Sequence, residues 1–348
     1  MDSSLFKLHL LYDANSHLDQ YLNDSTIKAI PFHLPYYCYK NIVPVAKTIS
    51  KIAFAIARYR INLIYLNDAI DFKFILPLIQ LLRLYRIPVI VHLHIDEDDV
   101  TLKWMKINAV DRLLFPSNAT MQAILNHSPW VDSKKCFCIH NAVDTAVYQP
   151  VDTSFLRQEL GLNDNFPIIG IVGRLTEIKG QHVFLEMVSK LKAKNINAHY
   201  LIVGSDSQQG TYLSFLQARA DDLGVQDEVR FLGYRKNIPQ LMSLLDLIIV
   251  PSMREPFGRV VIEAMACATP VVAAAVGGMV EIFKDGEGGL FFPVNDVDAL
   301  VAKALYFFHN PEWWEKQKAI AYQVVLNQFT QNIHTSKIEQ HMLSLLDR

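Results

Sequence analysis

The first 160 residues of this 348-residue chain contain no glycine, and all 14 glycines lie between Gly161 and Gly289. Such an uneven distribution indicates two halves of different construction. At roughly 100–200 residues per domain, the length also favours two compact domains over one. Hydrophobic residues make up 51% and charged residues 20% of the chain, which excludes a disordered or collagen-like protein.

An excess of one charge is also lacking. The formal net charge is −2, so the chain has no global electrostatic footprint for nucleic acid, and no nucleic-acid partner is expected. Apolar runs such as Leu244–Val250 fall far short of the roughly 18 residues that a membrane-spanning helix needs. The N-terminus has an acid at position 2 and no basic region before an apolar one, unlike a secretory signal. We therefore expect a cytoplasmic protein.

Cysteine is scarce, and no two cysteines form a C-x-x-C pair. We therefore expect reduced thiols and no cysteine-held metal. The four are Cys38, Cys136, Cys138 and Cys267.

Short apolar segments alternate with helix-like segments along the whole chain. In the first half we expect strands at 8–12, 61–66, 88–94, 112–116 and 136–140, and helices at 45–59, 70–85 and 118–126. In the second half we expect strands at 168–172, 200–203, 229–232, 247–251, 270–274 and 289–292. This alternation predicts an α/β fold of two doubly wound domains, each with a parallel sheet covered on both faces.

Turn formers cluster around 143–152 and predict the domain boundary there. The expected parts are an N-terminal domain at 1–150, a second domain at 151–310, and helices at 311–348 that pack back toward the N-terminal domain. No internal repeat is evident.

The densest chemical signal follows the expected strand at 247–251. Pro256 and Gly258 indicate a tight loop that leads into a helix, so a helix N-terminus points out of the carboxyl edge of the sheet. Ligands of open α/β sheets lie at that edge, and the free N–H groups favour a phosphate. Glu255 precedes this helix and Glu263 lies in its second turn, so both carboxylates could flank one ligand. Alternatively, the two acids only complement the helix dipole.

A second loop, after the expected strand at 168–172, carries Arg174 and Lys179. A guanidinium fork and a point charge together can hold a diphosphate without a metal. Surface charges in water are the alternative for this loop taken alone. Leu232–Arg235 and Gly277–Glu281 follow two further strands, and four strand ends at one edge favour a mononucleotide site with a charged sugar-phosphate.

Four segments together resemble the retaining GT-B glycosyltransferases of glycosyltransferase family 4. They are GRLTEIKG (173–180), FLGYRKNIPQLMSLLDLIIVPS (231–252), EPFGRVVIEAMACATPVV (255–272) and VGGMVEIFKDGEGGLFFPVND (276–296). The spacing of Glu255 and Glu263 is the family's signature. The resemblance implies a GT-B fold, in which two Rossmann-like domains face each other across a cleft.

The resemblance also implies roles for individual residues. The Gly173 loop with Arg174 and Lys179 would bind the donor diphosphate and carry the leaving-group charge, together with backbone N–H groups of Phe257, Gly258 and Arg259. Glu255 would contact hydroxyls of the transferred sugar.

Glu263 would accept hydrogen bonds from the ribose, and Tyr234 and Arg235 would line the base pocket. The implied reaction is retaining, metal-independent transfer of a sugar, with no cofactor beyond a UDP- or GDP-linked donor.

In the first half, His94 falls at the position of a histidine that faces the donor sugar in this family, and we expect it to be catalytic. A structural, hydrogen-bonded histidine is the alternative. His92 is expected to lie on the opposite face of the strand and is left out of the site. The family's glycine-rich first loop is replaced here by a segment with Asn15, Ser16 and His17. A catalytically weak partner subunit of a glycosyltransferase complex therefore stays open as an alternative.

The acceptor is expected to be a glycan or lipid-linked glycan in surface polysaccharide or lipopolysaccharide-type biosynthesis. Residues 28–60 lack acids but contain lysines, arginines and aromatics, which favours contact with the inner face of a membrane. A solvated helix face is the alternative for this segment. A sugar-phosphate enzyme of the same fold, such as a phosphorylase or epimerase, is an alternative function.

The D-x-D pattern in Asp96–Asp99 resembles the metal-binding motif of another glycosyltransferase class. The same short pattern recurs at Asp296 and Asp298, where a helix cap is expected, so the pattern has low specificity. We expect no metal site.

Overall fold

The computed structural model describes residues 2, 4–13, 28–32, 42–68, 72–162, 166–206 and 210–347. The chain forms two compact units. The first comprises Met1–Phe115, Met121–Ile139 and Thr335–Arg348, and the second Pro116–Thr120 and His140–His334. The chain therefore enters the second unit briefly at Pro116–Thr120, enters it again at His140, and returns to the first unit at Thr335. The domain limits at 150 and 310 stay a prediction.

The second unit is built on a six-stranded parallel sheet of order β12-β11-β10-β7-β8-β9. The strands are β7 (Ile168–Val172), β8 (His199–Val203), β9 (Val229–Gly233), β10 (Leu247–Val250), β11 (Val271–Ala274) and β12 (Gly289–Phe292). Counted from β7, this is the strand order of the mononucleotide-binding doubly wound fold. The order reverses between β7 and β10, which pair with Leu247 opposite Ile169.

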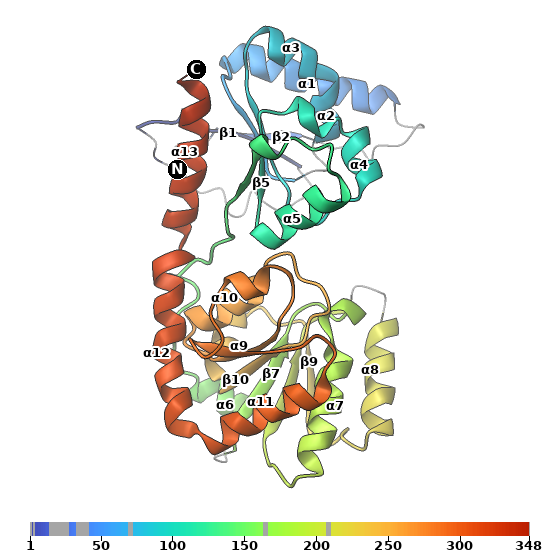
Figure 1. Cartoon of the computed structure of the whole chain (residues 1–348), viewed down its shortest axis with the longest axis vertical. Helices are drawn as coiled ribbons and strands as arrows, with labels where there is room; N and C mark the ends of the chain where they lie inside the picture. The colour runs from blue at the N-terminus through green and yellow to red at the C-terminus, as the bar shows by residue number, and fades with distance from the viewer. Residues whose placement is uncertain are drawn as a thin grey trace. The chain divides into compact units, whose positions relative to one another are not determined.

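Helices cover both faces of this sheet (Figure 1). On one face α7 (Gln181–Lys192) packs against α8 (Thr211–Asp222) and α11 (Val297–His309), and on the other α10 (Arg259–Ala266) packs against α9 (Ile238–Leu244) and α12 (Pro311–Gln328). The short α6 (Ser154–Glu159) lies beside α9. Two short 3-10 helices, η7 (Glu177–Lys179) and η8 (Gly277–Glu281), lie in loops at strand ends.

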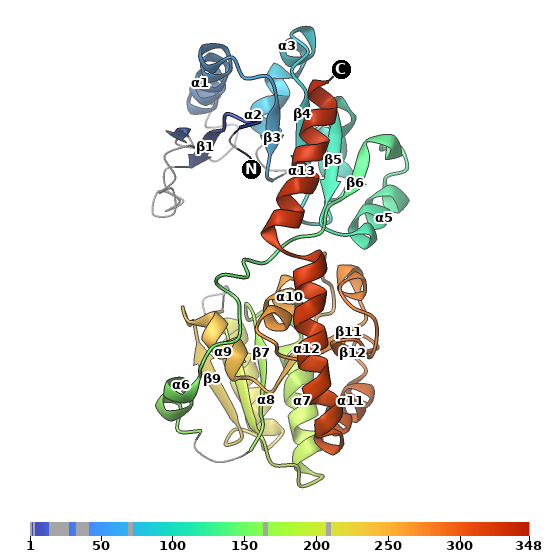
Figure 2. The same ribbon diagram turned by 90° about the vertical axis from the view of Figure 1, so that its left-hand side faces the viewer.

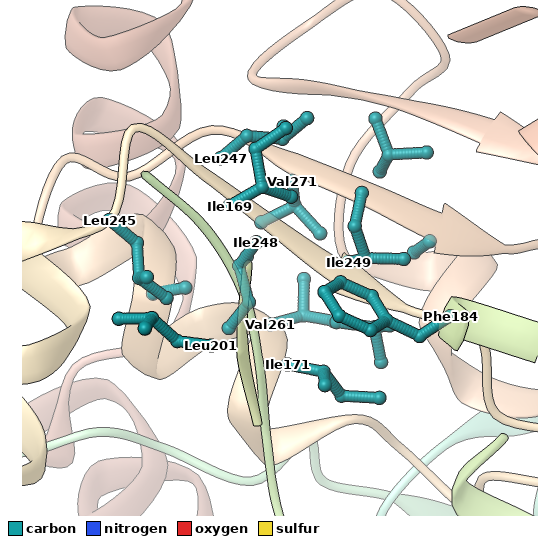
Figure 3. Close-up of a cluster of buried hydrophobic side chains, with 14 of the residues drawn as sticks. Ile169, Ile171, Phe184, Leu201, Leu245, Leu247, Ile248, Ile249, Val261 and Val271 are labelled. Atoms are coloured by element: carbon teal, nitrogen blue, oxygen red, sulfur yellow. The ribbon is translucent and has the colours of Figure 1, made fainter. Parts of the chain in front are cut away.

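Figure 3 shows the core of this unit, where Phe184 of α7 and Val261 of α10 approach the strands. Leu247, Ile248 and Ile249 are consecutive, yet all three are fully buried. Successive strand residues point to opposite faces, so both faces of β10 must be covered by apolar side chains. The continuous apolar run in the sequence is explained by this burial.

The first unit has a parallel sheet of order β3-β4-β5-β6 and a separate parallel pair, β1 and β2. The strands are β1 (His9–Asp13), β2 (Lys28–Phe32), β3 (Ile64–Leu66), β4 (Val89–His92), β5 (Arg112–Phe115) and β6 (Cys136–Cys138). The helices are α1 (Ile42–Tyr59), α2 (Phe72–Ile75), α3 (Ile79–Leu84), α4 (Asp99–Trp104), α5 (Asn118–His127) and α13 (Gln331–Leu346). The described residues of this unit also form the 3-10 helices η4 (Leu76–Leu78), η5 (Ile107–Ala109) and η6 (Ser133–Lys135).

Alternation along β4 assigns its two faces. Val89 and Val91 join one buried cluster, which includes Leu102 of α4. Ile90 joins a second cluster with Ile338 and Met342 of α13, so the last helix covers the other face of this sheet (Figure 2). The predicted α/β fold with two doubly wound parts is thus confirmed for the described residues.

Several elements differ from the prediction. The expected helix at 70–85 is divided into α2, η4 and α3 around Pro77, which lacks an N–H group for the helix ladder. The helices expected at 311–348 are α12 and α13, and the buried Phe329 lies between them in the sequence. Strand β2 was not predicted. No described helix is both long and apolar enough to cross a membrane.

Among the described cysteines, Cys136 and Cys267 are buried free thiols. Cys38 lies outside the described residues, as do Asn15, Ser16 and His17 of the unusual first loop.

Candidate active site

The two loops that carry most of the predicted site follow β7 and β10, the strands at which the sheet order reverses. Ligands of doubly wound folds bind outside the carboxyl ends of the strands at this point. The backbone joins the loops directly, because Met253 N–H donates to the Ile178 carbonyl at 2.8 Å. Gly180 has a φ of +72°, and a Cβ at this position would lie 2.2 Å from the Pro251 carbonyl oxygen. Only glycine allows the two loops to approach this closely.

Lys179 and Glu255, one from each loop, form an ion pair. The distance from Lys179 Nζ to Glu255 Oε2 is 2.5 Å, and the side chains are 27% and 11% exposed, respectively. The structure therefore brings together the cation predicted for the diphosphate and the carboxylate predicted for the sugar. The sequence predicts that both side chains face one ligand, but nothing in it marks the bond between them.

A third loop, η8 after β11, holds the backbone of Glu255. Gly278 N–H donates to the Glu255 carbonyl at 3.1 Å. Gly277 has a φ of +54°, and a Cβ there would lie 1.9 Å from the same oxygen. Because three loops meet at Glu255 and Lys179, the position of the pair is set by the fold of the unit.

Residues distant in the sequence hold the next part of this loop. Ser117 Oγ and Thr120 Oγ1 donate to the Pro256 carbonyl at 2.5 and 2.9 Å. Both side chains are buried. No sequence signal marks these two residues, since the contact spans more than 130 positions.

The N-terminus of α10 is the predicted phosphate contact. Gly258 is its N-cap residue, and no side chain caps the helix. Phe257 is buried, with its ring centroid 5.6 Å from that of His140. The N–H groups at this helix start carry partial positive charge.

Arg259 and Glu263 also bond to each other. Arg259 Nη2 lies 3.1 Å from Glu263 Oε1, and the Glu263 side chain is largely buried. Burial raises the pKa of Glu263 above its ordinary value of 4.5, and the charge and hydrogen bond of Arg259 oppose that rise. The predicted ribose contact therefore lies in a low-dielectric place beside the predicted phosphate contact.

The Arg174 loop has a buried support that sequence analysis missed. Gln181, the first residue of α7, donates from Nε2 to the Arg174 carbonyl at 2.9 Å and is almost fully buried. The loop is also anchored by Gly173 N–H, which donates to the Val203 carbonyl at 2.9 Å. Arg174 itself is exposed.

The predicted base contacts follow β9. The Tyr234 side chain is 69% exposed. Arg235 bonds Glu159 of α6 at 2.6 Å. The structure does not join Arg235 to the Lys179–Glu255 pair, and its role at the base stays a prediction.

Comparison with known families covers nearly the whole chain. The profile of the family described as "Glycosyl transferases group 1" matches residues 152–324. The profile described as "Glycosyltransferase Family 4" matches residues 7–147. This chain belongs to the group 1 glycosyltransferases. The resemblance inferred from the four segments is thereby confirmed.

Curated relatives of this glycosyltransferase include D-inositol 3-phosphate glycosyltransferases. The protein from Mycobacterium marinum is 32% identical over 199 residues, which are 56% of this chain and 42% of the relative. The protein from Stackebrandtia nassauensis is 37% identical over 161 residues, 44% of this chain and 36% of the relative. The matched part therefore spans less than half the length of these relatives.

Solved structures support the GT-B fold over the whole length. HepE from Anabaena in complex with UDP has a TM-score of 0.81 and 25% identity, and the match covers 97% of this chain and 92% of HepE. A glycosyltransferase from Rickettsia africae has a TM-score of 0.84 and 21% identity, with 97% and 90% covered.

His94 of the glycosyltransferase belongs to the first unit and follows the end of β4. Its Nε2 lies 3.4 Å from Asn67 Oδ1, and its ring contacts that of His92 in a tilted arrangement with centroids 4.2 Å apart. The expectation that His92 faces away from His94 is wrong, because residues two apart along a strand share a face. His92 is buried and bonds the Tyr65 hydroxyl at 2.7 Å. The catalytic role of His94 stays a prediction.

The acids of the D-x-D segment have structural partners. Asp98 caps α4 by accepting from Thr101 N–H at 2.7 Å. Asp99 accepts from Ser128 Oγ at 2.6 Å and from Trp130 Nε1 at 2.7 Å. Asp296 accepts from Ala299 N–H at 2.9 Å, which confirms the cap expected at the second D-x-D pattern.

Proposed function

We propose that this chain transfers a sugar from a UDP- or GDP-linked donor to a hydroxyl group of a glycan or glycolipid, with retention of configuration and without a metal. The observation that carries the proposal is the meeting of the β7 and β10 loops at the switch point, with Lys179 and Glu255 in contact. One loop supplies cations for a diphosphate and the other a carboxylate and a helix N-terminus.

The chemistry follows from where charge develops. When the bond between sugar and diphosphate breaks, negative charge grows on the departing phosphate. Lys179, Arg174 and the N–H groups at the start of α10 would stabilise that charge, which lowers the barrier. Their cationic charge supplies what a metal ion supplies in other glycosyltransferases.

A nucleoside diphosphate donor is supported by the solved relatives. HepE has been crystallised with UDP and with UDP-glucose, and the latter structure has a TM-score of 0.79 and 25% identity over 95% of this chain. A sugar nucleotide would present its diphosphate to Lys179 and its sugar hydroxyls to Glu255.

We further propose a lipid-linked or surface-polysaccharide acceptor reached at a membrane. On α1, Lys47, Lys51 and Arg58 are exposed, and Phe54 between them is 69% exposed. A basic face with an apolar side chain at its centre suits an anionic lipid surface. The remainder of the predicted membrane segment, residues 33–41, lies outside the described residues.

The membrane proposal is tested by sedimentation with vesicles. The protein should sediment with vesicles that contain phosphatidylglycerol and stay in the supernatant with phosphatidylcholine alone. Exchange of Lys47 and Lys51 for Gln should reduce sedimentation, and equal sedimentation of this variant would contradict the proposal.

The donor is tested by thermal unfolding in the presence of EDTA with UDP, GDP, ADP, CMP and their sugar conjugates. A ligand at 100 times its Kd stabilises a protein by about 2.7 kcal/mol, which shifts the melting temperature of a chain of this size by roughly 4 °C. A base-selective rise supports the proposal and names the donor for acceptor screens. A rise that requires Mn²⁺ contradicts metal independence, and no rise under either condition favours a partner subunit.

A further inference from the structure

The contact between Lys179 and Glu255 has a consequence for which nucleotide the site retains. We propose that Glu255 is an exchangeable counterion of Lys179, which makes the site favour a sugar-bearing nucleotide over the bare nucleoside diphosphate. This inference rests on the proposed function, and it concerns the discrimination between donor and nucleotide product.

The backbone fixes both partners. Lys179 immediately precedes Gly180, whose absent side chain lets the β7 loop touch Pro251 of the β10 loop. Glu255 is held by Gly277 and Gly278 of η8. A diphosphate can therefore recruit Lys179 only by turning its side chain, since neither loop can move away without breaking these contacts.

The carboxylate is the more buried member of the pair. With only 11% of the Glu255 side chain exposed, water can reach little of it. A carboxylate at such a position is costly unless a donor or a cation satisfies it. Among the described residues, the hydrogen bond to this carboxylate comes from Lys179.

A diphosphate competes with Glu255 for the same ammonium group. An ammonium group has three protons and can bridge two anions, but the two anions then repel each other across it. Binding of a bare nucleoside diphosphate is therefore weakened by the presence of Glu255.

A sugar nucleotide avoids this penalty. Hydroxyl groups of its sugar donate to Glu255 and replace the bond that Lys179 gives up, so Lys179 is released to the diphosphate. After transfer the sugar has left, Glu255 again requires Lys179, and the nucleoside diphosphate is held less tightly. The same ion pair thus favours donor binding and product release.

The test is calorimetric titration with UDP and UDP-glucose, and in parallel with GDP and a GDP-linked hexose, for wild type and Glu255→Gln. Glutamine keeps the size of the side chain but removes the charge. We expect the variant to bind the bare diphosphate tighter by roughly three- to tenfold, the range of a partly exposed ion pair. The sugar nucleotide should bind to the variant with the same affinity as to wild type, or more weakly. The preference for the sugar nucleotide over the bare diphosphate therefore falls.

A matched control removes an equal charge elsewhere in the same unit. Glu186 of α7 bonds Arg219 of α8 at 2.9 Å, and both side chains are about one-third exposed. Glu186→Gln should leave the affinities for both nucleotides within twofold. If it tightens the diphosphate as much as Glu255→Gln does, general electrostatics explains the effect and the proposal is overturned.

A double-mutant cycle with Lys179→Met shows whether the effect passes through the ion pair. In the Lys179→Met background, Glu255→Gln should tighten UDP less than it does in wild type, because the competition for the ammonium group is gone. An equal tightening in both backgrounds overturns the exchange, as does a loss of UDP affinity in Glu255→Gln with an unchanged circular dichroism spectrum.

Binding by the wild-type protein separates a failure of the proposed function from a failure of the exchange alone. A wild-type protein that binds none of the four nucleotides contradicts the proposed function, and the exchange with it. A wild-type protein that binds them, with Glu255→Gln showing an unchanged preference, contradicts only the exchange.

Discussion

Replacement of Glu281 by glutamine should destabilise the second unit in a pH-dependent way. Asn118 and Ala119 are the first two residues of α5. Their backbone N–H groups donate to the Glu281 carboxylate at 2.9 and 2.7 Å, respectively. It also accepts from Asn118 Nδ2 at 2.9 Å and lies 3.0 Å from His140 Nε2. Glu281 ends η8, the loop whose glycines hold Glu255.

The magnitude follows from the pKa of this carboxyl group. Burial alone would raise the pKa, but the bonds from His140, Asn118 and Ala119 outweigh burial and lower it from 4.5 to about 2. Such a lowering corresponds to about 3 kcal/mol of stability. Because a partly hydrated group is screened, we expect about 1–2 kcal/mol.

The direction of the pH dependence follows from the linkage between proton binding and folding. A carboxyl group whose pKa is lower in the folded state stabilises the fold above its unfolded pKa, and the stability is lost as the pH falls toward the folded value. The contribution of Glu281 should therefore be complete at pH 7 and decrease between about pH 4.5 and 2, the two values that bound it.

The assay is urea unfolding of wild type and Glu281→Gln, followed by circular dichroism in steps from pH 7 to pH 3. The difference in unfolding free energy should be about 1–2 kcal/mol at pH 7 and should shrink toward pH 3. Glu287→Gln is the control, because Glu287 is exposed and lies 3.8 Å from Lys284. A Glu281→Gln protein as stable as wild type at pH 7, or a difference independent of pH, would show that the Glu281 carboxylate does not stabilise this unit.

Three further predictions follow from the site. Gly180→Ala should lower the free energy of unfolding by about 1–3 kcal/mol more than Gly224→Ala does, as measured by thermal unfolding. Both glycines have positive φ, but only a Cβ at Gly180 meets a backbone atom, the Pro251 carbonyl oxygen. Equal losses would show that crowding at Gly180 is unimportant. Tyr234→Ala should leave the melting temperature unchanged, because the side chain is 69% exposed. Calorimetry should show UDP binding weakened by about fivefold or more. An unchanged affinity for UDP would exclude Tyr234 as a contact of the base. His94→Ala should lower kcat by about a hundredfold or more. The Kd for UDP should stay within twofold, because His94 lies in the first unit and the predicted nucleotide contacts lie in the second. A large change in Kd with an unchanged kcat would make His94 a binding residue.

The fold of the second unit could be predicted because its signals are local. The buried strands are continuous apolar runs, and the bounds of β7 and β12 equal the expected ranges. In the first unit Pro77 divides a helix that apolar periodicity alone predicts as one. Strand β2 was missed because Lys28–Phe32 is short and contains both a lysine and a proline, so neither alternation nor an apolar run marks it.

The site was predictable where loops follow strands and a residue type indicates its own chemistry, as for Arg174, Lys179 and Glu255. Its supports were not, because each is a contact between distant parts of the chain. Ser117 reaches Pro256 across 139 positions, and Asn118 reaches Glu281 across 163. The hydroxyl and amide groups that make these contacts are also common in ordinary loops.

Three of the cations predicted for the donor have carboxylate partners in the second unit: Lys179 with Glu255, Arg259 with Glu263, and Arg235 with Glu159. A site for a diphosphate needs several cations close together, and these would repel one another without counterions. The carboxylate beside each cation reduces that repulsion and keeps the cation oriented. An anion that takes the cation leaves its carboxylate without a partner. These carboxylates therefore weaken the binding of an anion that brings no hydroxyl groups to replace the lost bond. Stability of the loops and preference for a sugar nucleotide thus have one physical origin.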